Sequence, residues 1–240
     1  MIRIIEPRFS EEEKEVLLEI LDSGHITRGK WTALFQEEFA RYIGVKHVFT
    51  VCSGTVALFI ALKALNVEGK YVVVPAMSFM ATIDAVYLAG GIPVVVDVDE
   101  YYTMDPNQLE EAVKKYNPKV VIPVHLYGQT ADMDAIMWLS EKYGFYVLED
   151  AAQAHGAMWK GKRAGSLGHL SAFSFYASKN IPMGEGGAIA PHRLALPTGN
   201  QCLALPLSLG VWPQRPFPFL AHIPKPSLPT PLCLPQILSP

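Results

Sequence analysis

The 240-residue chain has few features of a secreted, membrane-spanning or nucleic-acid-binding protein. Its three cysteines show no paired spacing, which argues against a disulfide framework and a cysteine metal site. No apolar run approaches the roughly 20 residues needed to cross a bilayer. The acidic start MIRIIEPRFSEEEKE lacks the apolar core of a signal peptide. The net charge is −3 without a long basic run, so a nucleic-acid surface is not expected. We therefore expect a soluble cytoplasmic protein.

Two common phosphate-binding signatures are also missing from the sequence. No GxGxxG follows a predicted strand, and no P-loop is present, so dinucleotide and nucleoside triphosphate sites lack their usual fingerprints. No internal repeat is apparent. Half of the residues are hydrophobic and 18% are charged, a balance that predicts a substantial core.

The composition changes abruptly near residue 190. All 23 acidic residues precede this point, whereas residues 191–240 contain 12 of the 19 prolines. Such frequent prolines disrupt helices and central strands, yet the many leucines are unusual for a solvated disordered tail. We therefore expect a domain at residues 1–190 and an irregular Pro/Leu-rich tail at residues 191–240 that is foreign to it. Translation in a shifted reading frame is one hypothesis for the tail.

Residues 1–190 alternate between helical and strand patterns. A capping box formed by Ser10 and Glu13 predicts a helix that ends near Gly24. Further helices are expected from about residue 34 to Gly44, over 56–65, over 81–88, from Pro106 onward and over 133–143. Strands are expected over 45–51, 71–75, 92–98, 119–124, 145–150 and 172–176. Unbroken apolar strands separated by helices predict an α/β fold whose mostly parallel sheet is covered on both faces.

Ligands of such sheets bind outside the carboxyl ends of the strands, so residues at these ends carry the most information. Ser53, Gly54 and Thr55 follow a strand and open a helix, where exposed N–H groups and two hydroxyls suit a phosphate. Simple capping of the helix by Ser53 or Thr55 is the alternative. Asp150 ends a strand and suits a protonated ring nitrogen, a metal or the cap of the next turn. Its neighbour Glu149 is expected to face the other side of the sheet.

Aromatic and basic residues near other strand ends extend this set. Phe79 follows the strand at 71–75 and suits stacking on an aromatic ring, with core packing as the alternative. His125 and His155 are expected to be satisfied structural histidines. Lys179 lies between aromatic residues and a glycine cluster in SFYASKNIPMGEGG, a setting that suits a desolvated, nucleophilic amine. A phosphate cradle, a stacking aromatic, an acid and a lysine are together the parts that pyridoxal phosphate needs.

The sequence resembles the DegT/StrS-type sugar aminotransferases, which use pyridoxal phosphate. The resemblance covers nearly all of residues 1–190, through SGTVALFIALKAL, VVVPAMSFMAT, VIPVHLYGQTADMDAI, VLEDAAQAHGA and GSLGHLSAFSFYASKNIPMGEGG. It implies a three-layer fold type I large domain, incomplete here and followed by the irregular tail. It also implies that Lys179 holds the cofactor covalently and shuttles protons, and that Asp150 pairs with the ring nitrogen.

The remaining site residues follow from the same resemblance. It implies that Gln153 lies near the ring's 3-hydroxyl, that Phe79 stacks on the ring, and that the phosphate is bound by Gly54, Thr55 and Ser174. No metal is expected. Some relatives replace the lysine by histidine and act as dehydratases, so Lys179 favours transamination.

The implied reaction transfers an amino group, typically from glutamate, to a ketone on a nucleotide-linked sugar in amino-sugar or surface-polysaccharide biosynthesis. Members are generally homodimers in which the neighbour contributes to each site. After GEGGAIA the sequence departs from the family, so we expect a C-terminally truncated chain. Two alternatives stay open: a non-catalytic binding or regulatory remnant of the fold, and a dehydratase that uses the same cofactor.

Overall fold

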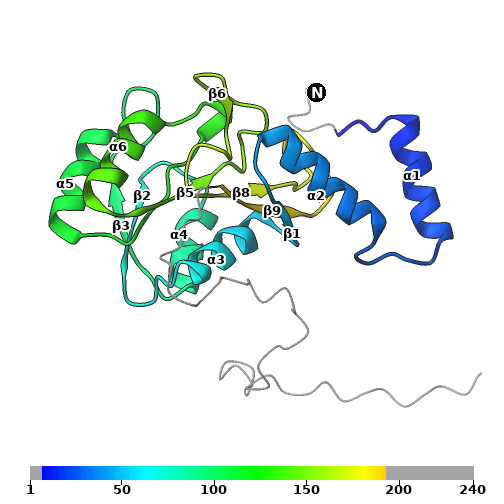
Figure 1. Cartoon of the computed structure of the whole chain (residues 1–240), viewed down its shortest axis with the longest axis horizontal. Helices are drawn as coiled ribbons and strands as arrows, with labels where there is room; N and C mark the ends of the chain where they lie inside the picture. Colours follow the sequence, from blue (N-terminus) through cyan, green and yellow to red (C-terminus); the bar gives the residue numbers. More distant parts are fainter. Residues whose placement is uncertain (1–6, 193–240) are drawn as a thin grey trace, which may run out of the picture. The chain divides into compact units, whose positions relative to one another are not determined.

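The computed structural model describes residues 7–192 and shows an α/β fold built on one seven-stranded sheet (Figure 1). The tail expected at residues 191–240 lies outside the described residues beyond position 192. The strands stand in the order β1-β9-β8-β5-β4-β2-β3. Their bounds are β1 Phe49–Val51, β2 Tyr71–Pro75, β3 Ile92–Val96, β4 Val120–Val121, β5 Tyr146–Asp150, β8 Leu170–Ser174 and β9 Gly187–Pro191. A separate two-stranded hairpin pairs β6 Met158–Trp159 with β7 Lys162–Arg163.

The mostly parallel sheet expected from the sequence is confirmed, with one antiparallel member. β3, β2, β4, β5 and β8 pair in parallel. β9 runs antiparallel between β8 and β1, so it is hydrogen-bonded on both sides. β9 was not predicted, because its sequence GAIAP is short and rich in small residues. Its last residue, Pro191, still pairs with Leu170.

The predicted helices are all present. They are α1 Glu11–Asp22, α2 Lys30–Ile43, α3 Gly54–Ala64, α4 Ala81–Leu88, α5 Pro106–Tyr116 and α6 Met133–Tyr143, with a short 3₁₀ turn, η1, at Leu126–Gly128. The Ser10–Glu13 capping box forms at the start of α1. Gly44 ends α2 in the left-handed conformation, with a φ of 84°, a conformation that glycine adopts without steric cost.

Alternate residues of the central strands enter two separate cores. Val72 and Val120 pack with α3 and α4, whereas their neighbours Val73 and Val121 pack with α5 and α6. Figure 1 shows these two helix pairs on opposite sides of the sheet. The pattern follows from the alternation of side chains along a strand, and it explains why both faces of β2 and β4 are apolar. The helices therefore cover both faces and leave the strand ends accessible.

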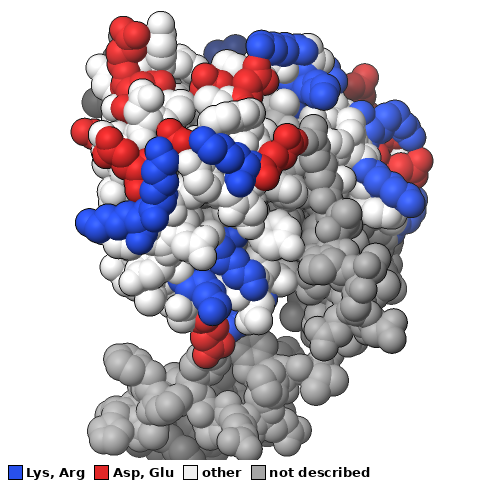
Figure 2. Space-filling model, turned by 60° about the vertical axis from the view of Figure 1, so that its left-hand side comes forward, with Lys and Arg blue, Asp and Glu red and all other residues white. Residues whose placement is uncertain are grey.

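The surface and the N-terminal helix add two observations. α1 has no buried residue, and its side chains Leu17, Leu18 and Leu21 are exposed. On the face drawn in Figure 2, basic side chains are interspersed with acidic ones. Within residues 7–192, every helix falls short of the length and hydrophobicity needed to span a membrane.

Candidate active site

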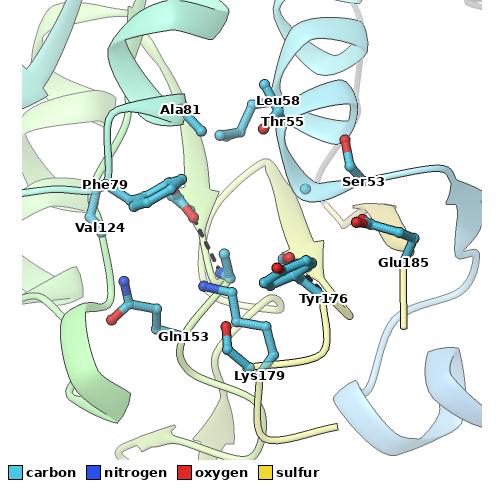
Figure 3. A pocket seen from close by; sticks show the side chains of 15 residues that line it. Ser53, Thr55, Leu58, Phe79, Ala81, Val124, Gln153, Tyr176, Lys179 and Glu185 are labelled. Atoms are coloured by element: carbon cyan, nitrogen blue, oxygen red, sulfur yellow. Dashed lines mark hydrogen bonds between the residues drawn. The ribbon is translucent and has the colours of Figure 1, made fainter. Parts of the chain in front are cut away.

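A cavity of about 320 Å³ opens where parallel strands of the sheet end (Figure 3). The residues that line it come from the ends of β5 and β8, the starts of α3 and α4, and the segments that follow β2, β4, β5 and β8. They are Ser53, Gly54, Thr55, Leu58, Phe79, Ala81, Val124, Asp150, Ala152, Gln153, Ser174, Tyr176, Ser178, Lys179 and Glu185. All seven site residues expected from the sequence are in this set: Gly54, Thr55, Phe79, Asp150, Gln153, Ser174 and Lys179.

The start of α3 forms one wall of the cavity. Ser53 caps the helix by accepting a hydrogen bond from the Val56 N–H at 3.2 Å, so the capping alternative is confirmed for Ser53. Gly54 and Thr55 then occupy the first turn, where backbone N–H groups have no partner within the helix. A Cβ on Gly54 would lie 2.7 Å from the Ser174 Cβ. This contact shows that only glycine lets the helix start approach the end of β8.

The β9 strand closes the same wall. A Cβ on Gly187, the first residue of β9, would lie 2.3 Å from the Ser53 carbonyl oxygen. The chain therefore needs glycine at both Gly54 and Gly187 to bring β1, β8 and β9 together at this edge. The result is a concave group of backbone N–H groups and hydroxyls with the positive end of α3 behind it, an arrangement that favours anions.

Asp150 ends β5 and is 5% exposed. Its Oδ2 accepts a hydrogen bond from the Thr82 hydroxyl at 2.8 Å, and its Oδ1 accepts one from the Ala152 N–H at 3.2 Å. Burial raises the pKa of Asp150, while these two hydrogen bonds act to lower it. No group of three potential metal ligands is found within residues 7–192. Asp150 therefore caps the local turn at Ala152 and also lines the cavity.

Lys179 and Phe79 face the cavity from different loops. Phe79 follows β2 and is 66% exposed, so the core-packing alternative for this residue is wrong. The Lys179 Nζ lies 5.8 Å from the centroid of the Phe79 ring. Figure 3 shows both side chains with Gln153 and Tyr176 around the one cavity. An aromatic face and an amine are therefore available to the same ligand.

The loop that carries Lys179 is the connection of the β8–β9 hairpin. Phe175 donates its N–H to the Gly186 carbonyl at 2.8 Å, and Ala177 donates to Gly184 at 2.9 Å. Gly184 has a φ of 79°, a conformation that side chains other than glycine rarely adopt. The glycine cluster after Lys179 therefore closes the hairpin that presents the lysine.

Gln153 is fixed from a neighbouring loop. Its Oε1 accepts a hydrogen bond from the Tyr127 N–H at 3.0 Å, and Tyr127 belongs to η1. This hydrogen bond orients the side-chain amide, whose nitrogen is the donor group of Gln153.

Glu149 and Asp150 point to opposite sides of the sheet, as the strand pattern predicted. The fully buried Glu149 accepts backbone hydrogen bonds from Gly165 at 2.7 Å, Leu167 at 2.8 Å and Gly168 at 2.6 Å. Its Oε2 also lies 3.0 Å from the His125 Nε2. The other ring nitrogen of His125 accepts from the Ala131 N–H at 3.2 Å, so Nε2 carries the proton. The expectation of a satisfied structural histidine is confirmed for His125.

The same expectation is wrong for His155. Both of its ring nitrogens are buried, and neither makes a hydrogen bond with any residue of the described range. The ring packs against Phe173 and Phe175, with centroids 5.5 and 5.3 Å away. The pKa of His155 is lowered to about 4, chiefly by burial and also by the positive charge of Lys179, while a polar contact with the Ser174 backbone acts to raise it. A neutral imidazole therefore lies beneath the lysine hairpin.

The structure also places residues at the cavity that the sequence did not single out. Tyr176, Ser178 and Glu185 lie on the hairpin loop beside Lys179. Their position depends on β9, so only recognition of that strand would have identified them. Thr82 is a different case, because its hydrogen bond to Asp150 spans 68 residues of sequence.

A mostly parallel sheet with an aspartate and a lysine at a cavity along its strand ends matches the large domain of aminotransferases. The chain belongs to the DegT/DnrJ/EryC1/StrS aminotransferase family, whose family model matches residues 7–202. The family resemblance found in the sequence is thus confirmed.

Individual relatives give the same result. The chain is 42% identical over 185 residues to the spore coat polysaccharide biosynthesis protein SpsC of Bacillus subtilis (strain 168). The matched region covers 76% of this chain and 47% of SpsC. It is 39% identical over 191 residues to the GDP-perosamine synthase of Caulobacter vibrioides, and this match covers 78% of this chain and 51% of the synthase. The PLP form of the putative sugar aminotransferase Spr1654 from Streptococcus pneumoniae superposes with a TM-score of 0.76 at 31% identity, covering 80% and 53%. The chain therefore spans about half the length of the relatives it matches.

Proposed function

We propose that the chain binds pyridoxal phosphate at this cavity, and that it is an aminotransferase acting on a nucleotide-linked keto-sugar with glutamate as the amino donor. The observation that carries the proposal is the meeting of all seven expected residues at one cavity. Names of relatives such as GDP-perosamine synthase support a sugar nucleotide as the acceptor class.

The residues present fit the cofactor in three respects. The close approach of Gly54 to Ser174 creates a cradle at the α3 N-terminus, which suits the phosphate together with the Thr55 hydroxyl. The buried Asp150 suits a cationic ring nitrogen, since a buried carboxylate is stable when it is paired. The exposed ring of Phe79 offers a flat apolar face.

When bound, pyridoxal phosphate supplies a carbonyl that condenses with amines and a ring that withdraws electrons from the attached carbon. Lys179 would hold the group through Nζ and, once released, would carry a proton at Nζ to and from the substrate carbon. Asp150 would keep the ring nitrogen protonated through its charge. Gln153 would donate from its amide nitrogen to the ring oxygen. Gly54, Thr55 and Ser174 would fix the opposite end of the cofactor.

A homodimer is part of the proposal. Large apolar side chains are exposed in or next to segments that line the cavity: Tyr176 lines it, Met80 follows Phe79, and Tyr127 donates its N–H to Gln153. Apolar surface of this kind is typical of a protein interface, which supports a second chain packing over this rim. Sedimentation of the purified chain with and without the cofactor would test this part.

Reconstitution of the full chain with pyridoxal phosphate tests cofactor binding. We expect a visible absorbance band, and reduction with borohydride followed by peptide mass mapping should place the label on Lys179. Lys179→Ala should lose both signals, whereas Lys63→Ala, on an exposed part of α3, should keep them. A folded chain without the band would refute cofactor binding.

The reaction is tested separately by incubating the loaded protein with glutamate and a nucleotide-linked keto-sugar. Formation of 2-oxoglutarate together with the amino sugar would support transamination. A deoxygenated sugar without loss of the amino donor would instead indicate a dehydratase. A loaded protein that forms neither product would support the non-catalytic remnant.

A further inference from the structure

We propose that Thr82 is a positioning residue for the cofactor site, acting through Asp150; this inference rests on the proposed function. Thr82 is fully buried in the first turn of α4 and is not one of the residues that line the cavity. Its hydroxyl nevertheless reaches the carboxylate at the end of β5.

Thr82 connects two of the groups proposed to contact the cofactor ring. Its side-chain hydroxyl donates to the Asp150 Oδ2 at 2.8 Å. Its backbone N–H donates to the Phe79 carbonyl oxygen at 3.0 Å. One residue therefore fixes both the acid that would face the ring nitrogen and the loop whose aromatic ring would cover the ring face. These two bonds can be separated by mutation, because only the first involves the side chain.

The hydroxyl also determines how Asp150 is held. The Ala152 N–H engages Oδ1, so donors from two different elements fix the two oxygens and hence the plane of the carboxylate. A hydrogen bond donated to a carboxylate favours its ionised form, and the N-terminal end of α4 acts in the same direction. Burial opposes both. His125 and Lys179 also lower the pKa of Asp150, but burial is the largest influence and the net change is a rise. Thr82 thus orients the carboxylate and favours its ionised form against the effect of burial.

Thr82→Val is the most direct perturbation, because it keeps the branched shape and the backbone hydrogen bond but removes the hydroxyl. We expect the dissociation constant for pyridoxal phosphate, measured by absorbance titration, to rise about ten- to hundredfold, as for the loss of a hydrogen bond to a charged group. The acid limb of cofactor binding should also shift to higher pH, since Asp150 would then protonate more readily. Thr82→Ser retains a hydroxyl and should bind nearly as tightly as the wild type.

Two controls distinguish positioning from general loss of structure. Thr103 is a second buried threonine whose hydroxyl bonds an aspartate, Asp99, in the loop after β3 away from the cavity. Thr103→Val should therefore leave cofactor affinity and its pH dependence unchanged. In an Asp150→Asn background, Thr82→Val should cause little further loss, because the group through which Thr82 acts is already altered.

The possible outcomes separate this inference from the proposed function. A wild-type chain that forms no band and no label on Lys179 removes the proposed function and this inference with it. A wild type that binds the cofactor, with a folded Thr82→Val that binds equally well at every pH, removes only the role of Thr82. Circular dichroism checks folding, and Thr82→Ala serves as a second hydroxyl-free variant. Failure of both variants to fold while Thr82→Ser binds normally would assign Thr82 to structure and overturn the proposal.

Discussion

Glu149→Gln is the sharpest test of the buried network behind the cavity. The wild-type carboxylate accepts hydrogen bonds from four donors: the backbone N–H groups of Gly165, Leu167 and Gly168, and His125 Nε2. The donors divide evenly, because Gly165 and His125 meet Oε2 whereas the other two meet Oε1. Glutamine keeps the shape but has only one acceptor oxygen.

The expected cost follows from this count. In either orientation of the glutamine amide, its NH₂ group faces two donors, so two hydrogen bonds to a charged acceptor are lost. Each such bond contributes about 1.5–3 kcal/mol, which gives a destabilisation of about 3–6 kcal/mol. A domain of ordinary stability has a free energy of unfolding of about 5–15 kcal/mol. The substitution should therefore remove a large fraction of the total.

Urea denaturation followed by circular dichroism measures this change as a shift of the midpoint to lower concentration. Glu141→Gln is the matched control, because Glu141 is exposed on α6, and its midpoint should stay close to that of the wild type. A loss of less than about 1 kcal/mol in Glu149→Gln would refute the reasoning. It would mean that the loop at 165–168 does not depend on the buried carboxylate.

Two further substitutions test the cradle and the buried imidazole. Gly54→Ala should weaken cofactor binding at least about tenfold, because its methyl group would lie 2.7 Å from the Ser174 Cβ. Gly29→Ala, whose Cβ would meet only ordinary contacts, should leave cofactor binding unchanged. Equal titration curves for the two variants would contradict the close approach at Gly54. His155 has a folded-state pKa of about 4 against 6.5, so the unfolded state binds more protons between these values. Wild-type stability should fall by up to about 3 kcal/mol as the pH drops from 6.5 to 4. His155→Phe should lack this loss. If the free energy of unfolding, measured by urea denaturation, changed with pH equally in the wild type and in His155→Phe, a buried neutral imidazole would be contradicted.

The sequence predicted what depends on local pattern. Helix ends followed from Ser10, Pro106 and Gly44, and the parallel strands followed from their unbroken apolar runs. The opposite orientation of Glu149 and Asp150 followed from the alternation of a strand. Gly54, Phe79 and Asp150 could be singled out because ligands of parallel sheets bind at strand ends. Gln153 and Ser174 followed only from the family resemblance.

The parts that escaped prediction depend on contacts between distant segments. GAIAP has no apolar period of its own, and its pairing partners in β1 and β8 determine that it is a strand. The donors to Glu149 come from a loop 16 to 19 residues away. The sequence predicted a satisfied structural histidine at His155. Its packing against Phe173 in β8 and against Phe175, the next residue but one, depends on contacts that the local sequence does not reveal.

The close contacts at Gly54 and Gly187 couple the phosphate cradle at the start of α3 to the β8–β9 hairpin that carries Lys179. Gly187 opens β9 directly against the Ser53 carbonyl oxygen, and the same hairpin presents Lys179. Displacing the hairpin would therefore displace the cradle as well. All the residues proposed to hold the cofactor lie between Ser53 and Lys179, so cofactor binding can be tested separately from amino transfer. A chain that forms the Lys179 adduct without transferring an amino group would localise the missing requirement for transfer outside these residues.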